Sequence, residues 1–92
     1  MIYTRKLILD VLKPHQPNAL EFCRGIATAG GDYQVRLLVI EMDEKTETVQ
    51  LVIKGETIDF EAVQSAIEGL GGSLHSIDEV EVCSETETAE TL

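Results

Sequence analysis

Hydrophobic residues recur along this chain with two different spacings, one typical of strands and one typical of helices. The first segment, YTRKLILDVLKPH at 3–15, alternates with a period of two and is apolar on both faces of the pleat. One face carries Leu7, Leu9 and Val11, and the other carries Ile8 and Leu12. A strand covered on both faces usually lies inside a sheet, so we predict that this is the central strand.

The remaining segments continue the alternation of helix and strand. They are a helix at 17–29, strands at 33–42 and 48–54, a helix after Asp59, and a strand at 73–82. Asn18 and Asp59 are candidate N-caps, and Gly71 has the position expected just after a helix. The polar turn at 43–46 is short enough to join the two middle strands as a hairpin.

The last strand has an irregular pattern. Its apolar residues Leu74, Ile77, Val80 and Val82 are spaced three, three and two apart, so a regular pleat cannot point them all to one side. A β-bulge within 76–79 reconciles them and changes the direction of Ser76 or Asp78.

The order of elements, βαββαβ, predicts a ferredoxin-like α+β fold. Right-handed crossovers give one antiparallel four-stranded sheet in the order fourth, first, third, second, with both helices on one face. The other face is left uncovered and apolar, which predicts self-association into a homo-oligomer. The expected interface residues are Ile8, Leu12, Leu38, Ile40, Met42 and Val52.

Length and charge narrow the classes of function. We expect residues 1–83 to form a single domain with a small hydrophobic core, and we expect the acidic segment 84–92 to be disordered. Seven Lys and Arg against 17 Asp and Glu give a net charge of −10, which disfavours nucleic acid and anionic membranes as partners.

No apolar run approaches the length of about 20 residues that a membrane span needs. Cys23 and Cys83 fit free thiols, so we expect a cytoplasmic protein.

Two histidines and an aspartate form one candidate metal site. The end of the first strand and the start of the fourth are expected to share one end of the sheet, which places His15 near His75, with Asp10 close by. Imidazole and carboxylate ligands suit zinc or another transition metal. The competing interpretation is that these histidines only bond to backbone at loop ends. Asp10, set between Ile8 and Leu12, also fits a hydrogen bond between subunits.

The acidic hairpin forms a second candidate metal site. Its carboxylates, Glu41, Asp43, Glu44 and Glu47, surround the turn at what we expect to be the other end of the sheet, together with Glu79, Glu81, Arg5 and Lys6. Oxygen ligands of this kind suit calcium or magnesium. The pattern lacks an EF-hand loop, and the competing interpretation is a solvated charged turn that is partly paired to the basic residues.

Three stretches carry a resemblance to a known family. They are RKLILDVLKPH at 5–15, IEMDEKTETVQLVIKG at 40–55 and IEGLGGSLHSIDEV at 67–80. The chain resembles the archaeal family called domain of unknown function 211 over nearly its whole length. The resemblance implies a ferredoxin-like fold and ring-like homo-oligomers, and it implies no established activity. The segment AGGDY at 29–33 and the acidic tail depart from the pattern expected of the family.

The sequence carries no glycine-rich phosphate loop, no GxSxG and no paired nucleophile and base. Three hypotheses therefore stand. The first is a non-catalytic, self-assembling ligand-binding or regulatory module, with calcium or magnesium as a possible ligand. The second is a metal-dependent enzyme that uses His15, His75 and Asp10. The third is a structural oligomer or accessory subunit that docks a protein partner.

Overall fold

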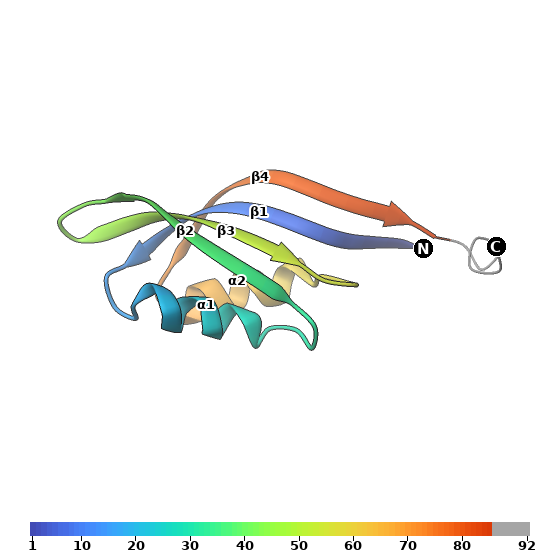
Figure 1. Cartoon of the computed structure of the whole chain (residues 1–92), viewed down its shortest axis with the longest axis horizontal. Coiled ribbons are helices and arrows are strands. Elements are labelled where there is room, and N and C mark those ends of the chain that lie inside the picture. Colours follow the sequence, from blue (N-terminus) through green and yellow to red (C-terminus); the bar gives the residue numbers. More distant parts are fainter. Residues whose placement is uncertain (86–92) are drawn as a thin grey trace.

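The computed structural model describes residues 1–85 as four strands and two helices (Figure 1). In chain order they are β1 (Ile2–Pro14), α1 (Ala19–Ala27), β2 (Gln34–Met42), β3 (Thr46–Lys54), α2 (Phe60–Gly69) and β4 (Ser73–Ser84). The domain is elongated, with extents of 53 × 22 × 17 Å. The β2–β3 hairpin projects at one end, and β1 and β4 run out together at the other (Figure 1).

All neighbouring strands are antiparallel, and their order is β2-β3-β1-β4. Both helices lie against the same face of the sheet (Figure 1). This confirms the predicted ferredoxin-like α+β fold, with β1 as a central strand between β3 and β4. The other face of the sheet has no helix over it, and we call it the open face.

The core lies between the helices and the covered face of the sheet. β1 and β3 contribute alternate residues to it, as their period-two pattern predicted. These buried residues are Leu7, Leu9, Val11, Val49, Leu51 and Ile53, which pack with Phe22 and Ile26 of α1 and with Val63 and Ile67 of α2. The helices are therefore held by one apolar stripe each.

The predicted N-caps of both helices and the position of Gly71 after α2 are confirmed, whereas α1 spans Ala19–Ala27 and is shorter than the predicted 17–29. The side chain of Asn18 accepts a hydrogen bond from the backbone N–H of Glu21, and that of Asp59 accepts one from Ala62. Both oxygens satisfy donors that the first turn of a helix leaves free. Gly71 has a φ of 88°, a left-handed conformation that glycine adopts at the ends of helices.

β4 contains the predicted bulge. The register against β1 skips Asp78, because Ile8 lies opposite Glu79 and Leu9 lies opposite Ile77. A second shift skips His75. These irregularities keep Leu74, Ile77 and Val80 opposite the core residues of β1. The side chain of Asp78 turns back to accept a hydrogen bond of 2.7 Å from the hydroxyl of Ser76.

A bulge in β2 corrects the face of the sheet on which Met42 was predicted to lie. Val39 lies opposite Val49, but the next paired residue is Glu41, opposite Thr48, so Ile40 is the extra residue. The extra residue shifts the alternation by one position. Glu41 therefore takes a place on the open face, and Met42 lies opposite Glu47, on the side of the sheet that carries the helices.

The carboxyl-terminal boundary also differs from the prediction. Ser84 is the last residue of β4, and the backbone of Glu85 pairs with that of Met1, with N···O distances of 2.9 and 3.0 Å. The sheet thus extends two residues into the predicted tail. The rest of that tail, 86–92, lies outside the described residues. No helix of the described part is long and apolar enough to cross a membrane.

Candidate functional site

The hairpin turn lies beside His15, which corrects the predicted layout of the sheet. Pro14 is opposite Thr46 in the register, because the end of β1 runs antiparallel to the start of β3. The acidic hairpin and His15 are therefore at the same end. Lys6 lies at the opposite end, where its ammonium pairs with Glu79 at 2.9 Å. The prediction that grouped Glu79 and Lys6 with the hairpin was wrong.

His15 joins β1 to the hairpin through both of its ring nitrogens. Nδ1 is 2.9 Å from a carboxylate oxygen of Glu47, and Nε2 is 3.0 Å from the carbonyl oxygens of Asp43 and Glu44. All three partners are acceptors, so a ring that satisfies them must donate from both nitrogens. Only the protonated imidazolium can do this.

The partner of His15 also neutralises a buried lysine. Lys13 is 0% exposed, and its Nζ donates to the carbonyl of Pro14 at 2.8 Å and to Glu47 at 3.3 Å. The ammonium lies 5.8 Å from the centre of the Phe22 ring. Burying one charge of this pair without the other would be costly, so Glu47 is the residue that makes a buried Lys13 tolerable.

These contacts shift two pKa values in opposite directions. The hydrogen bond to Glu47 is the largest cause that raises the pKa of His15, and the turn carbonyls add to it. The hydrogen bond to His15 is the largest cause that lowers the pKa of Glu47, with a further contribution from Lys13. The ordinary values are 6.5 for His15 and 4.5 for Glu47.

We expect stability to depend on pH through these two groups. The raised pKa of His15 means that its contribution is complete below pH 6.5 and is lost as pH rises through the folded-state value. The lowered pKa of Glu47 means that its contribution is complete above pH 4.5 and is lost as pH falls through the folded-state value. The contribution of these two groups to the free energy of unfolding is therefore greatest between pH 4.5 and pH 6.5, the two ordinary pKa values.

Urea unfolding midpoints measured from pH 5 to pH 9 test this expectation, with pH steps of about half a unit to resolve one titration. The midpoint should fall on the alkaline side in the wild type and in His75→Gln, the matched control. The fall should be absent in His15→Gln. A parallel fall in all three proteins would contradict it.

The predicted trio of His15, His75 and Asp10 divides between two places. Asp10 and His75 line a hollow of about 290 Å³ on the open face with Leu12 and Thr48, whereas His15 is engaged by the hairpin. Asp10 lies directly opposite Gln50 in the sheet.

The hairpin carboxylates are likewise separated. Glu47 is 7% exposed and turns toward Lys13, Glu41 shares the open face with Thr48, and the side chains of Asp43 and Glu44 are exposed at the turn. Within residues 1–85, no group of three or more His, Cys, Asp or Glu side chains is arranged to hold a metal ion. The cation-binding predictions therefore gain no support from the arrangement of these residues.

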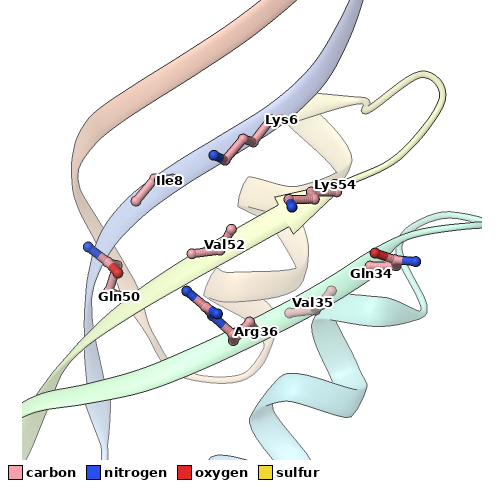
Figure 2. A pocket seen from close by; sticks show the side chains of 8 residues that line it. All are labelled: Lys6, Ile8, Gln34, Val35, Arg36, Gln50, Val52 and Lys54. Atoms are coloured by element: carbon pink, nitrogen blue, oxygen red, sulfur yellow. The ribbon is translucent and has the colours of Figure 1, made fainter.

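The open face instead presents a groove that the sequence analysis did not identify. It has a volume of about 490 Å³ and is formed by β1, β2 and β3 (Figure 2). Its lining residues are Lys6, Ile8, Gln34, Val35, Arg36, Gln50, Val52 and Lys54. The signal for it was present in the sequence, because outward positions of strands predicted to be neighbours carry Lys6, Arg36 and Lys54.

Both cysteines are free and half-buried. The thiol of Cys23 donates to the carbonyl of Val35 at 3.4 Å, and burial raises its pKa. A thiol with a raised pKa is a poor nucleophile at neutral pH, because little of it is present as thiolate.

The fold and its open face define this protein as a small ferredoxin-like α+β domain. The family model of DUF211, described as "Uncharacterized ArCR", matches residues 5–91. The chain is 41% identical over 76 residues to "Uncharacterized protein MJ0319" of Methanocaldococcus jannaschii, a match that covers 83% of this chain and 78% of that protein. The chain therefore belongs to the DUF211 family.

Proposed function

We propose that this protein is a non-catalytic, cytoplasmic ligand-binding module that assembles with copies of itself. The observation that carries the proposal is a pair of exposed apolar patches on opposite edges of the sheet. The first, which we call the hairpin patch, consists of Leu38, Val39, Ile40 and Met42 of β2, which are 39–63% exposed. The tip of the β2–β3 hairpin extends past the start of α1, so no helix lies over the tip (Figure 1).

The second patch lies on the other edge strand. We call it the β4 patch, and it consists of Ile77, Val80 and Val82, which are 47–55% exposed. β2 and β4 each have one neighbour in the sheet, so the backbone groups on their outer edges are open to another chain. Apolar side chains along an open edge favour association with another protein.

The partner that best fits both patches is a second copy of this chain. The two patches are different surfaces on opposite edges, so the hairpin patch of one copy can pack on the β4 patch of the next. Such head-to-tail contacts repeat from copy to copy, and they close into a ring if the rotation between copies allows it. Leu38, Ile40 and Met42 of the predicted interface belong to this contact, whereas Val52 lies in the groove on the open face.

Charge placed in either patch should break the assembly. We expect wild-type protein to give discrete multimers by native mass spectrometry, and Ile40→Glu and Val80→Glu to give monomers, because a carboxylate cannot be buried there without a partner. Leu20→Glu is the matched control, since Leu20 is 59% exposed on α1 and belongs to neither patch. A monomeric wild-type protein at micromolar concentration would overturn the proposal.

Mixing the two variants tests the head-to-tail arrangement itself. Ile40→Glu keeps an intact β4 patch and Val80→Glu keeps an intact hairpin patch, so an equimolar mixture should form heterodimers and stop there. If each patch instead paired with its own copy, each single variant would remain a dimer through the patch it retains.

A further inference from the structure

Three positive charges gather over the groove on the open face. Lys6 of β1 is directly opposite Lys54 of β3, and Arg36 of β2 is opposite Val52, the next open-face position along β3. Figure 2 shows these side chains on the same side of the three strands, with the helices behind. They are three of the seven Lys and Arg in a chain of net charge −10.

The fold gains nothing evident from this arrangement. Like charges directly opposite each other in a sheet repel, so placing Lys6 against Lys54 is unfavourable for stability. Glu79 of β4 forms an ion pair with Lys6 at 2.9 Å. Glu81, also in β4, lies opposite Lys6 in the register. Within residues 1–85, Arg36 and Lys54 form no ion pair.

The lining of the groove also lacks any carboxylate of its own. Among the residues described, those that line it are cationic, amide-bearing or apolar. Gln34 lies opposite Lys54, and Gln50 lies at the other end of the groove opposite Asp10. Arg36 and the lysines offer charged donors, and the two glutamines add neutral ones.

The floor of the groove is apolar. Val52 is only 8% exposed although no helix covers this face, and Ile8 lies opposite it in β1. A volume of about 490 Å³ is within the range of small-molecule sites. Donors around an apolar floor suit a ligand with a small apolar body and more than one negative group.

We propose that this groove binds a small organic anion that carries at least two negative charges on a short apolar body. Phosphate and carboxylate groups share the chemistry that the guanidinium of Arg36 recognises with two parallel hydrogen bonds. The proposal deepens the proposed function by giving the binding module a ligand class. Every lining residue belongs to one chain, so the groove does not depend on assembly.

Two simple probes separate the sources of the negative charge. Phenyl phosphate carries a phosphate ester on an apolar ring, and benzene-1,3-dicarboxylate carries two carboxylates on the same ring. Titration of the wild-type protein with each, followed by calorimetry, should give saturable binding of at least one. Benzylammonium, with the same ring and the opposite charge, should not bind.

Matched variants locate the binding. Arg36→Gln combined with Lys54→Gln should weaken binding of the better probe by at least about tenfold, because charged hydrogen bonds are lost. Arg24→Gln removes an equally basic side chain, which is 71% exposed on α1 and paired with Glu21, and should leave affinity unchanged. Unfolding midpoints close to wild type would show that the groove variant is folded.

The proposal is overturned if neither probe binds below about 10 mM, or if the groove variant and the wild type bind equally well. Native masses recorded on the same samples keep the two proposals apart. A monomer that binds the probe would reject assembly and retain the groove. A multimer that binds neither probe would retain the proposed assembly and reject the proposed groove.

Discussion

Glu47→Ala is expected to lower the free energy of unfolding by about 3–5 kcal/mol, the cost of leaving one charge of a buried pair without its partner. Lys13 is fully buried, and without Glu47 its ammonium retains only the carbonyl of Pro14 among its hydrogen-bond acceptors. Urea unfolding at fixed protein concentration measures the change, since assembly would otherwise contribute to stability.

Two further variants define what this result means. Glu44→Ala removes an exposed carboxylate from the adjacent turn and should change stability by less than about 0.5 kcal/mol. The double substitution Lys13→Met with Glu47→Leu removes both charges and should recover most of the loss. If Glu47→Ala matched Glu44→Ala, the pair would not be a buried one.

Phe22→Ala should destabilise the protein by about 3–5 kcal/mol, because it empties a fully buried site between α1 and the sheet. The ring tip is 2.9 Å from where a Cβ on Gly72 would lie, and the same ring faces the ammonium of Lys13. Its removal therefore opens a cavity next to a buried charge.

Thermal unfolding gives the clearest measurement of this loss. For a domain of this size each 1 kcal/mol corresponds to about 4–8 °C in Tm. Leu20→Ala, also on α1 but exposed, is the control and should move Tm by only a few degrees. Equal shifts for the two variants would mean that Phe22 is not packed as described.

The elements and their order could be predicted because each rests on a local pattern. Val49, Leu51 and Ile53 recur at every second position and are all buried, and the caps at Asn18 and Asp59 are single-residue signals. The bulge in β4 was also predictable, because its apolar spacing contradicted a regular pleat.

The features that were missed depend on pairings between distant segments. The burial of Lys13 was not predicted, since nothing near it in the sequence indicates that Glu47, 34 positions later, neutralises it. The bulge at Ile40 leaves no mark in an apolar run, so Met42 was assigned to the wrong face. The groove requires the register that sets Lys6 against Lys54 and Arg36 against Val52.

If the groove binds anions as proposed, the acidic surface around it would select those ligands by size. A chain of net charge −10 repels an approaching anion over a range of about 8 Å at physiological ionic strength, whereas the three cations attract at contact. A short anion places all its charge among those cations, but a long polyanion must lay most of its charge along the acidic remainder. We therefore expect the proposed anion groove to act as an electrostatic size filter that admits small anions and turns away nucleic acids.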